Sequence, residues 1–510
     1  MQFQTLRQTI PGSSTPPASS DLLARYRSVR AASLALTAPL SPEDLMVQSC
    51  PEASPAKWHL AHTSWFFETF VLREFLADYQ DFHPDFHWLF NSYYNSLGDM
   101  PAKSLRASFS RPPLADILAY RAHVDAAIAS LIESTPEFSA NAEAARRIAL
   151  GLEHEQQHQE LIATDIKHAL FTNPLHPAYR EPSAKPAPGL SIADSIAPPL
   201  DWIDFSPGLT QIGFAPGLTQ IGFAPEPDSA ESFCFDNETP RHPVYIAPFS
   251  LANRPVTCAE YLAFMDDDAY RRPELWLSEG WTTIHEQAWQ APLYWQSDPE
   301  TRSGWRIYTL HGWQSLDDLS ETPVCHLSFF EADAYARWAA RHTPGTRLPT
   351  EFEWEYAASQ LGTLLRGAPE HPNLLTYPAP ATNPGGPSFP ASSERVGSNV
   401  LTPSAIAATP ANLLETGILH PTRASALPGL QQIFGDVWEW TSSAYTGYPG
   451  YHPLPGALGE YNGKFMSSQM VLRGGSCVTP ATHIRATYRN FFTPATRWQF
   501  SGLRLARDPS

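Results

Sequence analysis

Cysteine is scarce in this chain. The 510 residues include five cysteines, and no two of them form a CxxC pair. An odd, scattered set argues against a disulfide framework and favours a reducing compartment. The first residues contain no apolar segment after a basic start, so no signal peptide is predicted. These features predict a cytoplasmic protein.

Two further absences narrow the function. No uninterrupted apolar run approaches the ~18–20 residues that span a bilayer, so we expect no membrane partner. The formal net charge is −18 and no run of Lys and Arg occurs. Binding to phosphate backbones depends on such basic clusters, and we therefore expect no nucleic-acid partner.

The first third of the chain has helical periodicity. Apolar residues recur three and four positions apart, as they do on the buried face of a helix. The segments with this pattern are 21–37, 57–79, 113–134 and 142–171. Four such segments predict an antiparallel helix bundle over residues 18–172.

The composition changes after this bundle. Residues 173–200 are rich in Pro, Ser and Ala and are interpreted as a linker. Residues 201–508 combine short β-type runs, many Gly and Trp residues and one clear helical stretch near 328–340. The chain as a whole is therefore predicted to be an α+β multidomain protein. Residues 367–428 are proline-rich and poorly charged, which predicts a long surface excursion.

A perfect tandem repeat interrupts the second part. PGLTQIGFA occupies residues 207–215 and again 216–224. Two copies are too few for a solenoid, which needs at least three. We interpret the repeat as a duplicated strand with one copy extruded, since loops tolerate insertions.

The segment HEQQHQE at residues 154–160 carries the strongest chemical signal. His154 and His158 are four residues apart and project from one face of a helix, together with small and apolar neighbours. Neutral imidazole is a common ligand for Zn, Cu, Fe and Ni. The letters also match the H-E-x-x-H pattern of zinc hydrolases, and chance spacing on a polar surface is the remaining alternative.

An earlier helix offers a third ligand. His62 lies in the segment KWHLAHTSWFFE, among apolar and aromatic residues that favour the bundle interior. His59, three residues before it, is the competing choice. Three imidazoles on one side of a divalent ion leave positions open for water, substrate and oxygen.

These motifs resemble those of a known family. LAHTSWFFE and HEQQHQE are similar to DinB-like helix bundles. RLPTEFEWEYAA, FGDVWEWTSSAY and VLRGGSC, which begin at residues 347, 434 and 471, resemble the formylglycine-generating-enzyme (sulfatase-modifying-factor) domain, a C-type-lectin-like α+β fold. The two domains in this order resemble the EgtB-like ergothioneine-biosynthetic sulfoxide synthases.

The resemblance implies a mononuclear, non-haem iron oxidoreductase. Its family holds Fe(2+) on three histidines, which correspond here to His62, His154 and His158. The family uses O2 to join hercynine, a trimethylhistidine, to a thiol as a sulfoxide. The family's hercynine-binding positions correspond to Gln157, Asn490 and Phe491, which are expected to bind that substrate here.

The resemblance also implies a tyrosine that donates a proton. Some members take it from the second domain, but residues 450–456 give no clear match. The helical domain instead contains Tyr93 and Tyr94, and in the branch that this chain most resembles paired tyrosines have this role. A phenol can donate both a proton and a hydrogen bond. The choice between the two stays open, as does a purely structural role.

The sulfur donor is expected to be cysteine, or else γ-glutamylcysteine. Members that use γ-glutamylcysteine have an aspartate where this chain has Phe492, and an apolar side chain cannot pair with the glutamyl ammonium group. Arg106, with Arg111 as the weaker candidate, offers a guanidinium for a substrate carboxylate.

Three other functions compete with this one. A formylglycine-generating oxidase would need two cysteine ligands near the C-terminus, where only Cys477 is found. A DinB-type metal-dependent thiol transferase or zinc hydrolase could use the same three histidines. A non-catalytic binding module with a vestigial metal site is the third alternative, and loss of His158 would separate it from an enzyme.

Overall fold

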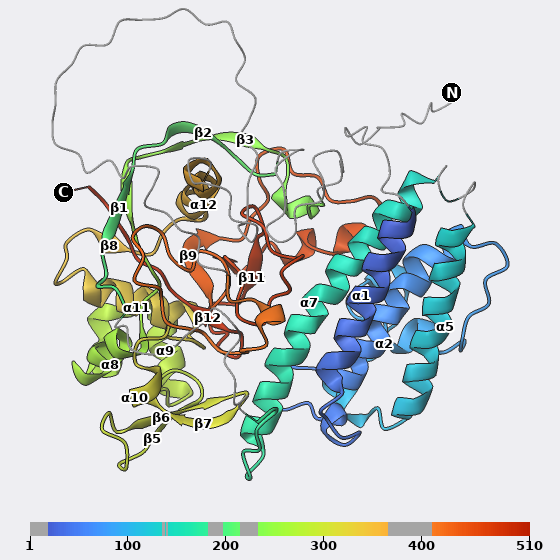
Figure 1. Cartoon of the computed structure of the whole chain (residues 1–510), viewed down its shortest axis with the longest axis horizontal. Helices are drawn as coiled ribbons and strands as arrows, with labels where there is room; N and C mark the ends of the chain where they lie inside the picture. The colour runs from blue at the N-terminus through green and yellow to red at the C-terminus, as the bar shows by residue number, and fades with distance from the viewer. Residues whose placement is uncertain are drawn as a thin grey trace, which may run out of the picture.

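The computed structural model describes residues 19–134, 138, 141–181, 197–214, 233–365 and 411–509. The early helices form a bundle, and the β-rich remainder packs against one side of it (Figure 1). This arrangement confirms the predicted α+β multidomain fold. The predicted domain boundaries themselves stay predictions.

Four long helices form the bundle, as predicted. They are α1 (Ser19–Thr37), α2 (Ala56–Phe67), α5 (Leu114–Glu133) and α7 (Ala142–Thr172). A π-helical turn, η2 (Glu68–Leu72), and a short α3 (Arg73–Phe75) extend α2, so the helix expected over 57–79 ends sooner. The connections contain η1 (Asp44–Met46), α4 (Phe86–Leu89), η3 (Asn95–Leu97) and η4 (Lys103–Ser108).

Helix α7 forms the wall between the bundle and the second domain (Figure 1). Its 31 residues extend over about 46 Å at the α-helical rise. The side chain of Asn141 caps its first turn by accepting a hydrogen bond from the Ala144 amide at 3.3 Å. A Cβ on Gly151 would lie 2.5 Å from the ring of Phe67. Glycine therefore allows α2 and α7 to approach closely, one turn before His154.

The second domain is built on short strands. Two four-stranded sheets have the orders β1-β4-β13-β8 and β11-β10-β9-β12, and β2-β3 and β5-β6-β7 form smaller sheets. The strands are β1 (Trp202–Phe205), β2 (Gly208–Ile212), β3 (His242–Ile246), β4 (Phe249–Ala252), β5 (Trp295–Ser297), β6 (Trp305–Thr309), β7 (Gly312–Ser315), β8 (Thr346–Arg347), β9 (Trp438–Ala444), β10 (Met470–Arg473), β11 (Asn490–Phe492), β12 (Ser501–Gly502) and β13 (Ala506–Arg507).

Short helices surround these sheets. They are α8 (Cys258–Asp266), α9 (Ser278–Glu286), α10 (Leu316–Leu319), α11 (Phe329–Ala339) and α12 (Glu351–Leu365), with 3-10 turns η5 (Asp236–Glu238), η6 (Ala269–Arg271), η7 (Pro273–Leu275), η9 (Leu414–Thr416), η10 (Gly456–Glu460) and η11 (Gly463–Phe465). The predicted helix near 328–340 is α11, capped by Ser328. The sequence pattern missed α8, α9 and α10, which are nine residues or shorter and give little periodicity. It also missed the 15-residue α12.

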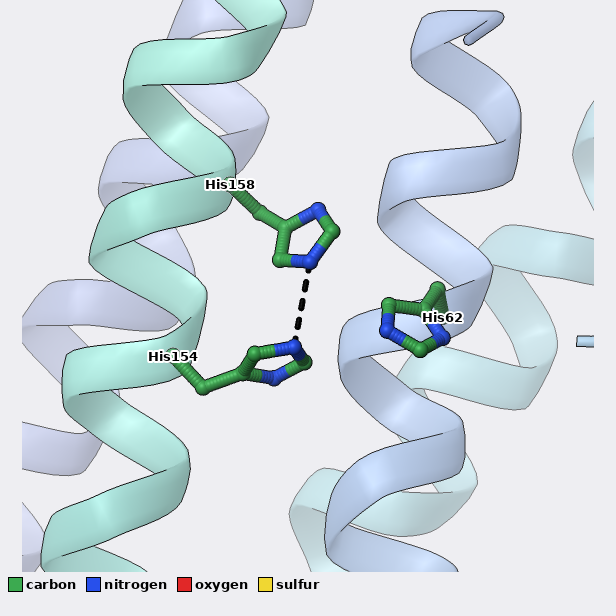
Figure 2. Close-up of side chains that lie close together, drawn as sticks. All are labelled: His62, His154 and His158. Atoms are coloured by element: carbon green, nitrogen blue, oxygen red, sulfur yellow. Dashed lines mark hydrogen bonds between the residues drawn. The ribbon is translucent and has the colours of Figure 1, made fainter. Parts of the chain in front are cut away.

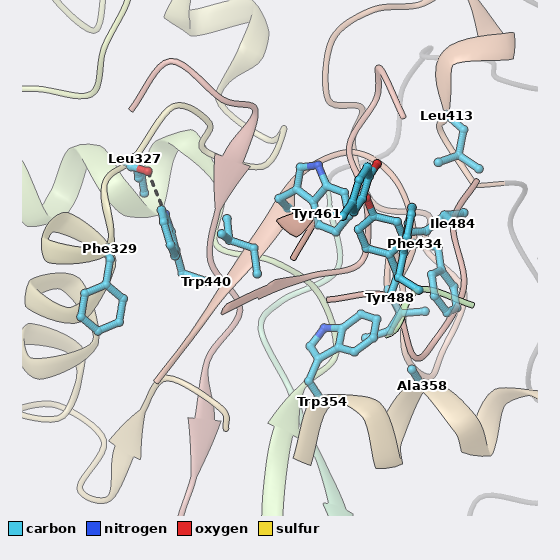
Figure 3. Close-up of a cluster of buried hydrophobic side chains, with 14 of the residues drawn as sticks. Leu327, Phe329, Trp354, Ala358, Leu413, Phe434, Trp440, Tyr461, Ile484 and Tyr488 are labelled. Atoms are coloured by element: carbon cyan, nitrogen blue, oxygen red, sulfur yellow. Dashed lines mark hydrogen bonds between the residues drawn. The ribbon is translucent and has the colours of Figure 1, made fainter. Parts of the chain in front are cut away.

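Buried aromatic and apolar side chains (Figure 3), together with buried ion pairs, hold the second domain together. The indole of Trp440 donates to the Leu327 carbonyl at 2.9 Å. The indole of Trp354 donates to Glu439 at 2.7 Å, and Arg504 pairs with the same carboxylate at 2.7 Å. Since both ions are fully buried, breaking one partner is expected to cost several kcal/mol.

Two sequence expectations fall partly outside the described residues. Residues 366–410 of the expected surface excursion are not described. Its end, 411–428, is only partly at the surface, since Leu413 and Leu419 are buried whereas Leu427 is exposed. The first copy of the tandem repeat supplies β2, which pairs antiparallel with β3; the second copy lies outside the described residues.

Among the described helices, none combines the length and the apolar character required to cross a bilayer.

Candidate metal centre

Three histidines converge between α2 and α7 (Figure 2). His62 projects from α2, while His154 and His158 project from successive turns of α7. One ring nitrogen of each lies within 4.8 Å of the others, and all three residues are buried. The structure therefore brings together the three residues that the sequence analysis predicted as metal ligands.

Hydrogen bonds at Nδ1 of His62 and of His158 leave the Nε2 atoms of these two rings for the space they share with His154. His62 Nδ1 lies 2.7 Å from the Phe90 carbonyl oxygen, which can only accept, so the proton is on Nδ1. Its Nε2 is buried without a hydrogen-bond partner in the part of the chain that the structure describes. The Nε2 atoms of His154 and His158 are 3.1 Å apart. A cation in this space would satisfy all three nitrogens.

The electrostatics favour metal binding over protonation. Burial lowers the pKa of His154 to about 3. Burial, assisted by the neighbouring imidazoles, lowers the pKa values of His62 and His158 well below the usual range. All three rings are therefore neutral near pH 7, which is the form that binds metal. The residues present fit a divalent ion with open coordination positions.

His59, the competing candidate, has a different place. Its Nδ1 lies 2.7 Å from His158 Nδ1, and its Nε2 lies 3.0 Å from Asp165 Oδ2. An ionised carboxylate only accepts, so the proton on His59 is on Nε2 and His158 carries its own on Nδ1. His59 thus supports His158 from behind and leaves Nε2 of His158 free for a metal.

Aromatic rings fix the orientation of the ligands. The ring of His62 stacks on Trp58 at 4.5 Å and on Trp65 at 5.3 Å, with interplanar angles of 13° and 15°. Phe66 lies 4.5 Å from the ring of His154. Because these contacts restrict rotation of the imidazoles, the side chains lose little conformational entropy when an ion binds.

The second domain completes one side of the centre. The ring of Tyr461 lies 5.6 Å from that of His154. Its hydroxyl donates to Gln157 Oε1, and Gln157 Nε2 donates to the hydroxyl of Tyr488 at 2.7 Å. Neither Tyr461 nor Tyr488 was predicted from the sequence. Tyr461 follows the stretch 450–456, which gave no clear match to the second-domain tyrosine of some family members, and no local pattern marks it.

Tyr93 and Tyr94 lie on the same side of the centre as Tyr461, since each of them interacts electrostatically with it. Their rings stack at 4.7 Å, and Tyr94 packs 5.5 Å from Trp65, the indole behind His62. Burial raises the pKa of both phenols, so both stay protonated at neutral pH. Tyr93 also contacts Phe465 of the second domain at 5.2 Å.

Arg106 is a buried cation beside the centre. Its guanidinium lies 3.4 Å from the centroid of Trp58, the indole that stacks on His62. It donates to the hydroxyls of Ser54 and Ser92, at 2.9 and 3.2 Å, and no carboxylate lies within ion-pair distance of it among the described residues. Burial lowers its pKa to about 9. Arg111, by contrast, is exposed.

Asn490, Phe491 and Phe492 form β11, and all three are half-buried. Phe491 stacks on Tyr445 at 4.0 Å and approaches Phe465, the ring next to Tyr93. Phe492 meets Trp498 edge-on at 5.5 Å. The Oδ1 of Asn490 accepts from the amide of Phe491 at 2.9 Å. Phe491 is thus linked through Phe465 to Tyr93, whereas Phe492 packs on Trp498.

A second link joins β11 to the metal ligands. Trp498, which packs on Phe492, donates its indole N–H to Asp165 at 3.1 Å. Asp165 is the carboxylate that supports His59 and, through it, His158. Hydrogen bonds therefore connect Trp498 of the second domain, through Asp165 and His59, to His158.

Comparison with known proteins agrees with this two-part architecture. Residues 25–162 match the DinB superfamily, and residues 208–509 match the sulfatase-modifying factor enzyme 1-like domain. The hercynine oxygenase of Mycolicibacterium smegmatis is 30% identical over 471 residues, which cover 91% of this chain and 94% of that protein.

The chain belongs to the hercynine oxygenase family. It is an EgtB-like member in which a DinB domain precedes the sulfatase-modifying-factor domain. The hercynine oxygenase of Mycolicibacterium thermoresistibile is 35% identical over 285 residues, which cover 54% of this chain and 55% of that protein.

The formylglycine-generating enzymes match about half of this chain. That of Streptomyces coelicolor is 29% identical over 308 residues and covers 54% of this chain and 84% of its own length. In this chain Cys477 is fully buried, and burial raises the pKa of its thiol well above the usual value. A buried, protonated thiol is a poor metal ligand or nucleophile.

Proposed function

We propose that this chain is an iron(II)- and oxygen-dependent sulfoxide synthase that joins hercynine to cysteine in ergothioneine biosynthesis. The observation that carries the proposal is the convergence of three buried, neutral imidazoles with open coordination positions, in a chain of the hercynine oxygenase family. Ferrous iron is the metal that this family membership favours, because imidazole alone does not select among divalent ions.

The reaction balances with oxygen as the only oxidant. The imidazole of hercynine loses one C–H hydrogen and the thiol loses its S–H hydrogen. One oxygen atom becomes the sulfoxide oxygen, and the other leaves as water with the two hydrogens. Formation of the C–S bond and oxidation of sulfur each release two electrons, which together reduce one O2. Bound iron would supply the redox chemistry that amino-acid side chains lack.

The protein's part is to order the substrates and exclude water. The indoles of Trp58 and Trp65 and the ring of Phe66 surround the ligands with apolar surface. When hercynine and the thiol are bound side by side, the reaction no longer requires a simultaneous encounter of hercynine, thiol and O2 in solution.

Hercynine is proposed to bind between α7 and β11. Its trimethylammonium group has no N–H, so it is best held by amide oxygens and aromatic faces. Gln157, Asn490 and Phe491 supply such groups. The contact of Gln157 with Tyr461, whose ring lies beside His154, supports this location.

A tyrosine of the Tyr93–Tyr94 pair is proposed to hold the proton that the reaction requires. Both phenols are kept protonated by burial, and Tyr94 packs against the indole behind His62. Tyr461 is a weaker candidate because its hydroxyl proton is already donated to Gln157.

Cysteine is the proposed sulfur donor. Arg106 is a buried cation without a carboxylate partner among the described residues, which suits the carboxylate of a small amino acid. Phe492 and Trp498 present an apolar surface where a γ-glutamyl ammonium group would need a charge. Phe492→Asp is expected to increase turnover of γ-glutamylcysteine relative to cysteine.

The test is a matched set of reactions. The protein is loaded anaerobically with ferrous iron and mixed with hercynine and either cysteine or γ-glutamylcysteine. Oxygen is then admitted and the products are identified by mass. We expect a sulfoxide of hercynine and cysteine, formed only with iron and oxygen.

Three results would contradict the proposal. Activity with zinc in the absence of oxygen would favour a DinB-type transferase or hydrolase. Binding of hercynine without any product would favour a binding module. Equal or faster turnover of γ-glutamylcysteine would overturn the assignment of the sulfur donor alone.

A further inference from the structure

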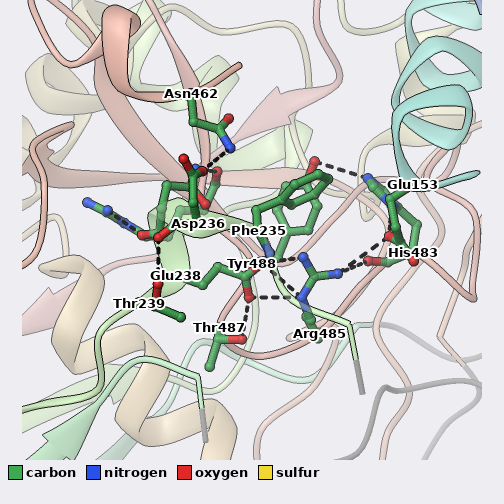
Figure 4. Close-up of polar contacts among 12 residues, drawn as sticks. Glu153, Phe235, Asp236, Glu238, Thr239, Asn462, His483, Arg485, Thr487 and Tyr488 are labelled. Atoms are coloured by element: carbon green, nitrogen blue, oxygen red, sulfur yellow. Dashed lines mark hydrogen bonds and ion pairs between the residues drawn. The ribbon is translucent and has the colours of Figure 1, made fainter. Parts of the chain in front are cut away.

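A hydrogen-bonded chain crosses from the bundle to the second domain and back, beside the metal centre. Glu153 Oε2 lies 2.6 Å from His483 Nδ1, and His483 Nε2 lies 3.0 Å from the hydroxyl of Tyr488 (Figure 4). Tyr488 accepts from Gln157 Nε2 at 2.7 Å, and Gln157 Oε1 accepts from Tyr461. Glu153 and Gln157 are both on α7.

The carboxylate of Glu153 determines which atom donates and which accepts in each of these hydrogen bonds. Glu153 is completely buried and also pairs with Arg25 at 2.5 Å. An ionised carboxylate only accepts hydrogen bonds, so His483 must carry its proton on Nδ1. Burial lowers the pKa of His483, and a neutral ring then presents a lone pair at Nε2.

This order of donors and acceptors continues along the hydrogen bonds to Gln157. Tyr488 must donate its proton to His483, so its oxygen can only accept from the neighbour on the other side. Of the two ends of the Gln157 amide, only the nitrogen can donate. The carbonyl oxygen is therefore turned toward Tyr461 and the ring of His154. Packing alone could not select this orientation, because the two ends of an amide have nearly the same size.

We propose that His483 and Tyr488 are positioning residues that turn the carbonyl oxygen of Gln157 toward the trimethylammonium group of the substrate. The identity of that cation rests on the proposed function. A trimethylammonium group meets an amide only through charge–dipole attraction, which is favourable at the oxygen and unfavourable at the NH2 end. Neither residue touches the substrate in this proposal.

A purely structural role for the same contacts makes a different prediction. If the chain only fastened the two domains together, its loss would weaken every ligand of the site and lower the thermal stability. If these hydrogen bonds orient Gln157, removing them should lower the affinity only for ligands that carry the trimethylammonium group. Hercynine and imidazolepropionate separate these cases, because they share an imidazole and a carboxylate and differ in the trimethylammonium group.

The experiment is calorimetric titration of the full-length, iron(II)-loaded protein without oxygen. Tyr488→Phe removes the acceptor of the Gln157 N–H and should weaken hercynine binding by about tenfold, as expected for a misplaced polar contact to a charge. Binding of imidazolepropionate should change by less than about twofold. Thr482→Ala, the matched control, removes a 2.5 Å hydrogen bond to Gln156 at the same boundary and should leave both affinities unchanged.

Two substitutions of His483 provide an independent test if Tyr488→Phe fails to fold. A glutamine side chain reaches the position of the histidine Nε2 and can still accept from Tyr488, whereas asparagine reaches only the position of Nδ1. His483→Gln should therefore retain hercynine affinity within about threefold, and His483→Asn should lose about tenfold.

The outcomes separate this inference from the proposed function. Equal weakening of both ligands by Tyr488→Phe, or no weakening of hercynine, would overturn the positioning role. Equal affinities of the two His483 variants for hercynine would do the same. If the wild-type protein failed to bind hercynine, the proposed function would be contradicted, and this inference, which rests on it, would be contradicted as well.

Discussion

Two groups of buried histidines lie along α7, and only one has the geometry of a metal site. His62, His154 and His158 form the first group, and His326 and His420 lie near Lys167 further along the helix. Burial lowers the pKa of every one of these imidazoles. Both groups also contain ring nitrogens without a hydrogen-bond partner among the described residues.

The difference between the groups is the presence of a cation from the chain itself. Lys167 Nζ lies 2.7 Å from His326 Nε2 and is held between the rings of Tyr294 and Phe500, at 4.8 and 4.7 Å. A metal ion beside this ammonium group would meet a like charge. Burial and unsatisfied nitrogens therefore do not identify a metal centre by themselves. Convergence of several ring nitrogens, none of which hydrogen-bonds to a cationic side chain of the described residues, does.

The largest expected effect comes from removing a ligand. His158→Ala should abolish stoichiometric iron binding and reduce oxygen-dependent product formation by more than the ~100-fold cost of losing a supporting residue. Iron content by elemental analysis and product formation by mass spectrometry measure the two effects. His326→Ala is the matched variant in the other group, and loss of iron from it would remove the distinction between the two groups.

Removing the support behind His158 should have the next largest effect. His59→Ala and Asp165→Asn each interrupt the chain that fixes the proton of His158 on Nδ1. We expect iron affinity to fall by about 10- to 100-fold, measured by competition with a chelator. His83→Ala, which changes an exposed histidine, is the control. Unchanged affinity in both variants would show that His158 needs no such support.

Arg106 provides a more moderate test. Arg106→Leu should raise the KM for cysteine by about tenfold, because a charge-assisted hydrogen bond to the carboxylate is lost. The KM for hercynine should stay constant. Arg111→Leu, which changes an exposed arginine, should have no comparable effect. A matching rise in both KM values for Arg106→Leu would mean that the residue supports Trp58 and the centre, and does not hold the thiol.

The smallest expected effect concerns the second group and pH. Burial holds the pKa of His420 at about 3 in the folded protein, against about 6.5 in the unfolded chain. Below pH 6.5 the unfolded state gains a proton that the folded state does not, so the free energy of unfolding decreases as the pH falls. His420→Gln should remove about 1 kcal/mol of this decrease between pH 7.5 and 6.

Urea denaturation of both proteins at several pH values measures this difference. Parallel curves of stability against pH would mean that folding does not shift the pKa of His420. Iron content should be the same in both proteins, since His420 is not part of the metal centre.

Some of the architecture could be predicted from local sequence. The helical period of three to four residues marked all four bundle helices, and α7 matches the predicted 142–171 to within one residue. The short helices of the second domain gave no usable period. Its sheets also join strands distant in the sequence, such as β4 and β13, so their pairing is decided by the packed domain.

The residues of the site likewise divide into those that local sequence predicts and those that only tertiary contacts determine. The four-residue spacing of His154 and His158 is enough to place both on one face of a helix. The resemblance to a family favoured His62 over His59. Spacing could not decide between them, because the choice depends on which face of α2 meets α7. Tyr461 and Tyr488 could not be found from local patterns, because they reach the centre through contacts between domains.

The sequence by itself determined that a helix bundle carries two histidines one helical turn apart on a buried face, because helical spacing is a local property. Only the tertiary structure decided that His62 completes the group, that His59 supports it, and which way the Gln157 amide points. Those features depend on hydrogen bonds between residues far apart in the chain, and such bonds are fixed by the packing of whole helices and domains.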